Sequence, residues 1–185
     1  KGASVLKQLV AWVGRDEFLA GVRAYFAEHA WGNTELSDLF AHLEKTSGRD
    51  LSAWGEQWLQ TAGVNTLRPV VELDGDGAYA SVTILQSAPD DHPTLREHRI
   101  AVGLYDHAPN GIVRRRRIEV DVSDVRTDLR ELVGEQQPDL LLLNDDDLTF
   151  AKVRLDERSR QTVVRGIGRI SSSLARALCW TAATD

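Results

Sequence analysis

The sequence contains a single cysteine, Cys179. One cysteine cannot form a disulfide within the chain, and no cysteine and histidine residues are spaced for a structural zinc site. Both absences favour a reducing compartment, so we expect a cytoplasmic protein. The neighbours of Cys179 are apolar, so we expect its thiol to lie in a core rather than to act as a nucleophile.

Positive charge is also scarce, because 22 Lys and Arg residues oppose 28 Asp and Glu residues and leave a net charge of −6. Binding to nucleic acid or to an anionic membrane needs a basic face, so the charge balance argues against both partners. Hydrophobic residues make up 42% of the chain and charged residues 27%. This composition excludes a wholly disordered, collagenous or membrane-spanning chain.

Methionine is absent, and the chain begins at Lys1. The first residues lead directly into helical apolar spacing, without the charged and apolar regions of a signal peptide. We therefore expect a piece of a longer polypeptide. Its 185 residues allow one large domain or two small ones.

The first third of the sequence has the apolar spacing of four consecutive helices joined by short loops. Asp16, Thr34 and Asp50 are the expected N-caps of the second, third and fourth helices, and Gly48 the expected end of the third. The predicted helices cover residues 3–13, 16–32, 34–48 and 50–63. Such a succession implies a packed helical layer.

After residue 63 the apolar spacing changes from helical to alternating, with Gly, Pro and Asp at the turns. Short strands of this kind, each with one face to bury, are typical of an antiparallel β-sandwich. The predicted strands lie within residues 67–73, 79–84, 100–104, 118–122, 129–133, 140–143 and 150–155. From residue 159 helical spacing returns, with Ser159 or Ser171 as a cap and Gly166-Ile167-Gly168 as an interruption.

No motif in the sequence completes an active site. A hydrolytic zinc site is commonly built on His-Glu-x-x-His, and a serine hydrolase on Gly-x-Ser-x-Gly, and neither occurs. We therefore assign no catalytic and no metal-binding residue, and the substrate-binding residues are unknown. A surface or capping role is expected for each histidine, namely His29, His42, His92, His98 and His107.

Three further groups have both a structural and a functional interpretation. Arg114 to Arg117 could bind a phosphate or an acidic partner, but neighbours on a strand face opposite ways, which favours a solvated sheet edge. Asp145 to Asp147 are consecutive rather than spaced as in a calcium loop, which favours a turn. Trp54 and Trp58 have helical spacing and are expected in a core rather than lining a pocket together with Trp12 and Trp31.

Several segments, in order, resemble M1-family zinc aminopeptidases of the bacterial aminopeptidase N type. The segment 1–9 is similar to the stretch that follows the catalytic tyrosine of that family in a Tyr-x-Lys-Gly-Ala pattern. Later segments that resemble the family are 18–26, 38–43, 51–63 with Trp54, Trp58, Thr61 and Gly63, 143–156 and 175–180. The resemblance covers essentially the whole chain.

The resemblance implies an α+β fragment of a multidomain enzyme. Residues 1–63 would be the helical end of a thermolysin-like catalytic domain, 64–158 an antiparallel β-sandwich, and 159–185 the beginning of a C-terminal helical domain. The intact parent would bind zinc and release N-terminal residues from peptides. The family's zinc ligands and its catalytic tyrosine would precede Lys1, so this chain is expected to bind no zinc and to supply scaffold and inter-domain geometry.

One alternative remains open. The sandwich could be a free-standing module that binds a protein partner through its arginine run or a sheet edge. The aminopeptidase interpretation itself predicts that the first helices are a domain remnant. They could then self-associate, and Val5, Leu9, Phe18 or Val22 would be exposed or buried against another chain.

Overall fold

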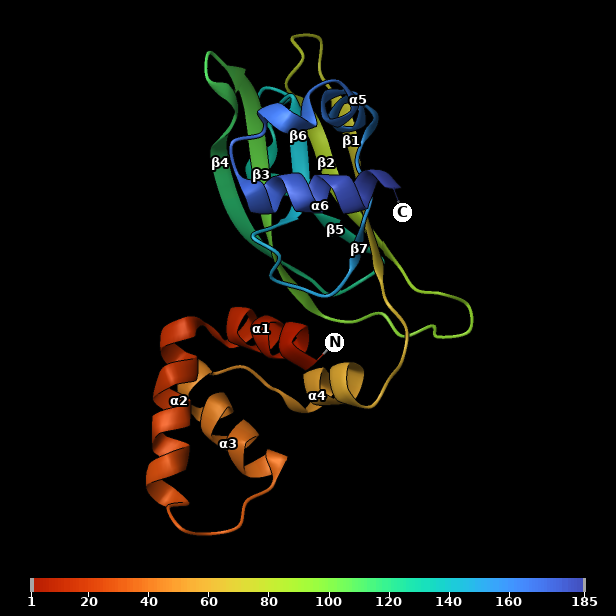
Figure 1. The fold of residues 1–185 in the computed structure, drawn as a ribbon. Coiled ribbons are helices and arrows are strands. Elements are labelled where there is room, and N and C mark those ends of the chain that lie inside the picture. Colours follow the sequence, from red (N-terminus) through yellow and green to blue (C-terminus); the bar gives the residue numbers. More distant parts are fainter. Residues whose placement is uncertain (1, 185) are drawn as a thin grey trace. The chain divides into compact units, whose positions relative to one another are not determined.

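A computed structural model describes residues 2–184, so Lys1 and Asp185, each the end of an expected domain, lie outside the described residues. The chain divides into two compact units, Lys1–Thr61 and Ala62–Asp185. The first is helical and the second contains two β-sheets with helices (Figure 1). This confirms the predicted α+β fold class. Among the described residues, no helix is both long and apolar enough to cross a membrane.

The first unit contains the four predicted helices. They are α1 (Gly2–Val13), α2 (Arg15–Glu28), α3 (Leu36–Ser47) and α4 (Ser52–Leu59). α3 ends as predicted at Gly48, whose φ of 70° lies in the left-handed region that glycine tolerates. α2 and α4 end several residues earlier than predicted.

The predicted N-caps of these helices are wrong. Gly14 precedes α2 without a side-chain cap, and Asp16 lies within the first helical turn. Glu35 rather than Thr34 occupies the N-cap of α3, and its backbone N–H donates to Asp38 at 2.8 Å. Asp50 accepts a hydrogen bond from the backbone N–H of Ser52 at 2.8 Å, although Leu51 holds the N-cap position of α4.

The interior of the first unit depends on close helix packing. A methyl group added at Gly21 of α2 would lie only 2.8 Å from Leu43 of α3, so the two helices meet where α2 has no side chain. Trp54 and Trp58 of α4 are buried and stacked, with ring centroids 5.9 Å apart. The prediction that both tryptophans belong to a core is therefore confirmed.

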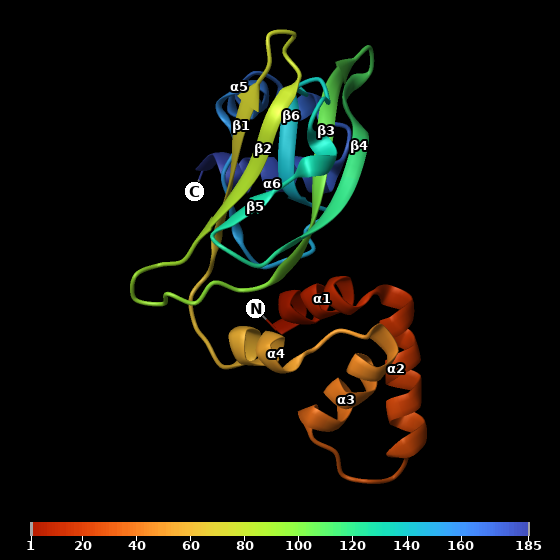
Figure 2. The ribbon, with the colours of Figure 1, turned by 180° about the vertical axis from the view of Figure 1, so that it is seen from behind.

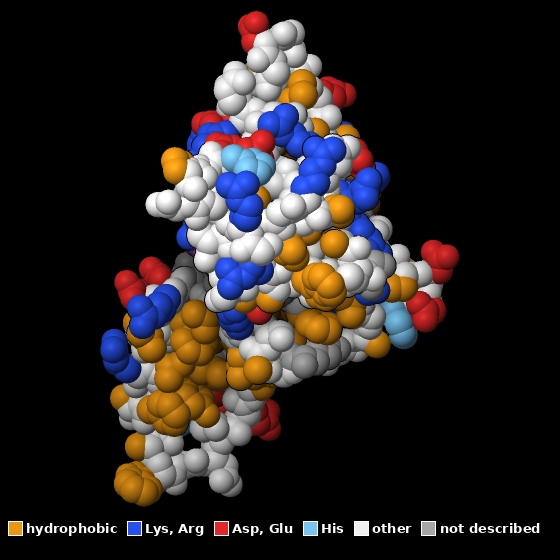
Figure 3. Space-filling view, turned by 45° about the horizontal axis from the view of Figure 1, so that its top comes forward, with side chains coloured by type: hydrophobic (Ala, Val, Ile, Leu, Met, Phe, Trp, Pro, Cys, Tyr) orange, Lys and Arg blue, Asp and Glu red, His pale blue; other side chains and the backbone are white. Residues whose placement is uncertain are grey.

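The expected exposure of Val5, Leu9, Phe18 or Val22 is not observed. Val5 and Leu9 are buried, which is contrary to the expectation, whereas Phe18 and Val22 are half-buried. Other large apolar side chains of this unit are exposed, namely Leu6, Leu19, Phe26, Trp31, Leu36 and Leu59. In the space-filling view, hydrophobic side chains form visible patches on the surface (Figure 3).

The second unit contains a β-sandwich. One sheet has the strand order β5-β2-β1-β7 and the other β4-β3-β6. All neighbouring strands are antiparallel except β1 and β7, which pair in parallel. The strands are β1 (Thr66–Leu73), β2 (Tyr79–Ser87), β3 (His98–Ala108), β4 (Gly111–Val122), β5 (Arg126–Asp128), β6 (Leu140–Asp145) and β7 (Lys152–Val153).

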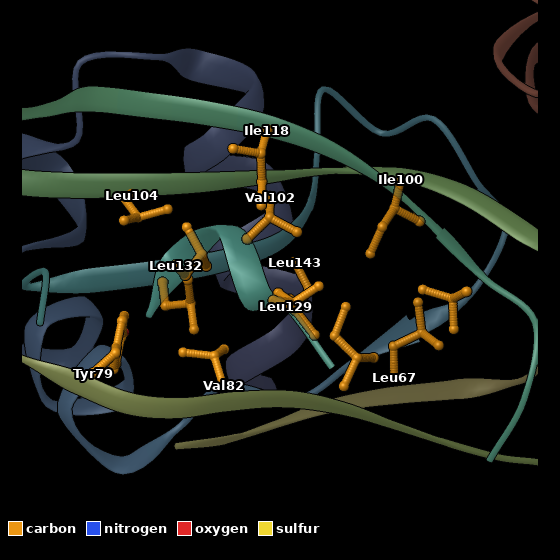
Figure 4. Packing of buried hydrophobic residues seen from close by; sticks show 13 residues of the cluster. Leu67, Tyr79, Val82, Ile100, Val102, Leu104, Ile118, Leu129, Leu132 and Leu143 are labelled. Atoms are coloured by element: carbon orange, nitrogen blue, oxygen red, sulfur yellow. The ribbon is translucent and has the colours of Figure 1, made fainter. Parts of the chain in front are cut away.

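The two sheets enclose one apolar core. Alternate residues of the facing strands belong to it, such as Val102 and Leu104 of β3 and Leu141 and Leu143 of β6. Figure 4 shows Val102, Leu104 and Leu143 in this core. The segment 129–133, which the sequence predicts as a strand, instead forms the 3-10 helix η1 (Arg130–Leu132). Leu129 and Leu132 still enter the core, because helical spacing also brings these two residues to one face.

Two further helices cover the outer face of the β4-β3-β6 sheet. They are α5 (Glu157–Gly166) and α6 (Ser173–Thr184), with the 3-10 helix η2 (Ile167–Arg169) between them. α6 crosses this sheet, on the side away from the other sheet (Figures 1 and 2). Leu140 and Leu142 of β6 point into this second core, where they join Val163 of α5 and Cys179 of α6.

The interruption predicted at Gly166-Ile167-Gly168 is confirmed, because α5 ends at Gly166 and a 3-10 turn follows. The predicted caps are wrong. The side chain of Asp156 caps α5 by accepting a hydrogen bond from the backbone N–H of Ser159. Near the start of α6, Ser172 rather than Ser171 accepts a hydrogen bond from the backbone N–H of Ala175 at 3.2 Å.

The close packing on the outer face of this sheet can be tested at Gly103 of β3. A methyl group at this position would overlap the Asp145 carboxylate and lie 2.7 Å from the Tyr105 ring. We expect Gly103→Ala to lower the free energy of unfolding by about 1–3 kcal/mol, because a packed interior cannot accept the added volume. Urea unfolding would measure this effect. Gly75→Ala is the control, because no atom lies within 4 Å of the added methyl group. Equal stability of the two variants would contradict the prediction.

Candidate functional site

The candidate functional residues of the sequence fall into separate places in the structure. Cys179 is buried in the core between α6 and the sheet, as predicted. Burial and then the nearby carboxylate of Asp145 raise the pKa of the Cys179 thiol to about 12. The thiol therefore stays protonated near neutral pH, which excludes a role as a nucleophile under those conditions.

The arginine run lies on β4 at the edge of its sheet, as predicted, but carboxylates of the same unit bind all four guanidinium groups. Arg114 Nη1 lies 2.8 Å from Asp145 Oδ2, and Arg117 Nε lies 2.6 Å from Asp146 Oδ2. The carboxylate of Glu135 binds both Arg115 and Arg116. The expected solvated edge is confirmed, because Arg114, Arg115 and Arg117 are exposed, and the structure adds that their charges are paired.

A β-bulge changes which arginines share a face. Tyr105 pairs with Arg114 and Leu104 pairs with Arg116, so Arg115 is an extra residue in β4. The bulge breaks the alternation of side chains. Arg115 and Arg116 therefore share Glu135, whereas Arg114 and Arg117 share Asp146.

The aspartate run forms a turn at the end of β6, as predicted. Asp146 and Asp147 have positive φ values of 68° and 55°, which aspartate tolerates better than most residues. Burial alone would raise the pKa of Asp146, but hydrogen bonds from Arg117 and Arg114 lower it below its usual value. Asp145 is only 2% exposed and accepts a hydrogen bond from the Tyr105 hydroxyl at 2.9 Å.

The Arg114–Asp145 pair gives a second prediction. In Arg114→Met the buried Asp145 carboxylate would lose its cation, and we expect the free energy of unfolding to fall by about 2 kcal/mol. This is less than for a fully buried pair, because the Arg114 side chain is 35% exposed. Chemical denaturation measures the loss. Arg160→Met on α5 removes an exposed ion pair with Glu157 and serves as the control, with no measurable change expected. A similar loss in both variants would show that burial of the carboxylate is not the cause.

A buried polar cluster, which we name the junction cluster, lies at the start of the second unit and consists of Asn65, Arg96, His98 and Thr149. Asn65 Nδ2 donates to the Thr94 carbonyl at 2.7 Å, and Asn65 Oδ1 accepts from the Arg96 backbone N–H at 3.2 Å. Arg96 is only 2% exposed, and its Nη2 donates to the Ala62 carbonyl at 2.6 Å. The cluster therefore holds the segment after residue 61 against the loop before β3.

His98 completes this cluster as a neutral imidazole. Its Nε2 lies 3.2 Å from Asn65 Oδ1, which can only accept, so Nε2 carries the proton. Its Nδ1 then accepts a hydrogen bond from the Thr149 hydroxyl at 2.7 Å. Burial, and then the charge of Arg96, lower the pKa of His98 to about 3. The sequence-based expectation of a surface or capping histidine is thus wrong for His98.

The depressed pKa of His98 predicts acid sensitivity. The unfolded chain takes up a proton at His98 near its ordinary pKa of 6.5, whereas the folded chain does so only near pH 3. The resulting stability is fully present above pH 6.5 and declines as the pH falls toward 3. Between about pH 7.5 and pH 5 we expect the free energy of unfolding of the unmodified protein to fall by about 2 kcal/mol more than that of His98→Gln.

Urea unfolding at both pH values tests this prediction, and comparison with the variant removes the contribution of titrating carboxylates. His92→Gln is the matched control, because the His92 side chain is 45% exposed, and it should show the same pH dependence as the unmodified protein. If His98→Gln keeps the full pH dependence, His98 is not the group responsible.

Three of the other histidines occupy two different surroundings. His107 Nδ1 lies 2.7 Å from Asp139 Oδ2, beside a cavity of about 390 Å³ that is also lined by Arg158, Arg165 and Arg169. His29 and His42 lie together with Glu28 in the first unit, and their potential ligand atoms are within 4.8 Å of one another. The sequence did not indicate this grouping, because His29 and His42 are not spaced as a metal motif.

Sequence reasoning also missed the junction cluster. Its members are far apart in the chain, and Asn65 and Thr149 have no local pattern that distinguishes them from loop residues. The signal that could have found them is weak. The signal is the position of these polar residues, just before a strand or after a buried strand, where backbone groups need hydrogen-bond partners.

Comparison with known proteins relates the two units to one family. Residues 1–58 match the Peptidase family M1 domain. The chain is 55% identical over 192 residues to an aminopeptidase N of Streptomyces lividans, with 100% of this chain and 22% of the relative covered. It is 28% identical to a tricorn protease-interacting factor F2 of Thermoplasma volcanium, with 93% of this chain and 19% of the relative covered.

A solved structure shows the same fold. The crystal structure of Legionella pneumophila aminopeptidase A in complex with aspartic acid matches with a TM-score of 0.72 and 14% identity, covering 96% of this chain and 20% of that chain. The chain thus spans about a fifth of the length of these relatives. The ordered sequence resemblance to M1-family aminopeptidases is therefore confirmed, through the M1 domain match in residues 1–58 and the match of the whole chain to an aminopeptidase N.

Proposed function

We propose that the chain is the part of a zinc aminopeptidase in which the catalytic domain ends and the following domains begin. In this proposal residues 1–63 end the thermolysin-like catalytic domain, 64–158 form the β-sandwich, and 159–185 begin the C-terminal helical domain. One observation carries it. The match to the M1 domain stops at residue 58, within α4, whereas the 55% identity to an aminopeptidase N extends over the whole chain.

The proposed role of this chain is architectural. Hydrogen bonds from Asn65 and Arg96 to backbone carbonyls fix the segment that follows the first unit. The helices α5 and α6 are packed on the β4-β3-β6 sheet. Contacts that fix the segments before and after the strands are what a spacer between domains would require.

Zinc in the intact protein would polarise the scissile carbonyl and activate water. The residues of this chain do not fit that catalytic role. His-Glu-x-x-His is absent from the sequence. Among the described residues, the group formed by Glu28, His29 and His42 contains one carboxylate, and as a ligand it would leave no second carboxylate to act as the base. We therefore assign no hydrolytic step to a side chain of this chain.

The remaining parts of the proposal concern the whole protein. Peptides are its proposed substrates, because several relatives in the family are aminopeptidases. A cytoplasmic location is proposed because the single cysteine offers no disulfide. Self-association through α2 is proposed on the basis of its exposed side chains Leu19 and Phe26.

The alternative of a free-standing binding module has weaker support. A module that presents its arginine run to an acidic partner needs guanidinium groups that are available. Those of Arg114 to Arg117 already bind carboxylates of the same unit. An external acidic partner would have to displace these ion pairs.

Hydrolysis of an aminoacyl reporter substrate tests the proposal. We expect no turnover by the 185-residue chain, with or without added zinc, because it lacks the catalytic motif. The control is a chain extended upstream to include His-Glu-x-x-His, and it should show zinc-dependent turnover. Turnover by the 185-residue chain itself, or upstream coding sequence without the zinc motif, would contradict the proposal.

A further inference from the structure

Three side chains at one end of the α2–α3 pair offer a set of ligand atoms. Glu28 is the last residue of α2, His29 is its C-cap, and His42 lies in the middle of α3. One atom from each, two imidazole nitrogens and one carboxylate oxygen, lies within 4.8 Å of the other two. Two imidazoles and a carboxylate are a donor set that zinc binds in proteins.

The distances are close to those that a shared ion requires. Ligands at about 2.0–2.1 Å from a tetrahedral ion lie about 3.3 Å from one another. His42 Nε2 and Glu28 Oε2 are 3.5 Å apart. The His29 and His42 rings have centroids 5.6 Å apart and are nearly perpendicular. Two imidazoles on one tetrahedral ion would have their centroids about 5 Å apart, so only small side-chain movements are needed.

Helix packing holds the backbone of the two histidines in place, whereas the Glu28 side chain can move. α2 and α3 pack closely where Gly21 meets Leu43, and this contact fixes the backbone that carries the histidines. The His42 side chain is 11% exposed, so its position is set by packing. The Glu28 side chain is 70% exposed and can rotate to complete a site without disturbing the core.

Local electrostatics also favour a cation here. The carbonyl groups at the C-terminal end of a helix carry partial negative charge, and Lys or Arg residues often compensate it. The last turn of α2 contains no basic residue. A metal ion held by Glu28 and His29 would lie beside these carbonyl groups and supply the missing positive charge.

From this geometry we propose that Glu28, His29 and His42 form a binding site for a divalent transition-metal ion of the zinc type. This changes the sequence-based expectation of a chain without metal ligands. The site would connect the end of α2 to α3 across the loop of residues 30–35 and stabilise the first unit. It does not depend on the proposed function, and its experiment measures binding rather than turnover.

The edge-to-face contact of His29 and His42 also has an explanation without metal. Tyr25 lies beside both rings, with centroids 5.3 Å from His29 and 6.1 Å from His42. Aromatic rings pack in this way through their own quadrupoles. In that case the ligand atoms meet only as a consequence of ring packing, and zinc would not bind. A metal titration separates the two explanations.

Isothermal titration of the full, tag-free chain with Zn²⁺ after removal of metal tests the proposal. We expect one ion per chain with micromolar affinity and a higher melting temperature in the presence of zinc. His42→Gln and His29→Asn should each weaken binding by about tenfold or more, because a ligand is lost. Glu28→Gln, at an exposed position, keeps the fold and should also weaken binding.

His107→Gln is the matched control. His107 also has a carboxylate partner, at 2.7 Å, but it does not belong to the group of potential metal ligands found among the described residues. This variant should bind zinc like the unmodified chain, and circular dichroism without metal checks the fold of each variant. The proposal is overturned if the unmodified chain binds no zinc at submillimolar concentration. Binding that survives loss of Glu28, His29 and His42, or that falls equally in His107→Gln, would also overturn it.

Discussion

The second unit depends on the burial of β6 from both sides. Leu141 and Leu143 point into the core between the sheets, whereas Leu140 and Leu142 point toward α5 and α6. A strand that is apolar on both faces exposes a hydrophobic surface unless two layers cover it. The helices after residue 156 therefore bury the outer face of the β4-β3-β6 sheet, and they lie in the same compact unit as the strands. This constraint also fixes Cys179, which fills the outer core.

The same outer face also contains a buried carboxylate, that of Asp145, together with its partners. Gly103 leaves room beneath the carboxylate of Asp145, and Tyr105 and Arg114 bind that carboxylate. A buried carboxylate without these partners would be costly. The bulge at Arg115 then separates the arginine run into two pairs, each matched to carboxylates of the same unit. The arginine run, which in the sequence suggests an acidic partner, thus forms ion pairs within its own unit.

Buried polar contacts fix the start of the second unit. The junction cluster binds the backbone just after the first unit, and its neutral histidine tolerates burial because both ring nitrogens have partners. The two units use different kinds of interaction. Close helix packing and stacked tryptophans hold the helical unit, whereas sheet pairing, two apolar cores and ion pairs hold the second.

Local pattern was sufficient for the elements that form from neighbouring residues. The four helices and the hairpins around Gly77 and Gly111 follow from spacing and turn residues, and so they could be predicted from the sequence. The N-caps could not, because side chains with similar capping ability compete within a few residues, and neither could η1, because its apolar residues also suit a short strand. Partners distant in sequence were decided only by the tertiary structure. His98 with Asn65, Arg114 with Asp145, and His29 with His42 meet because packing brings separate elements together, which no local pattern records.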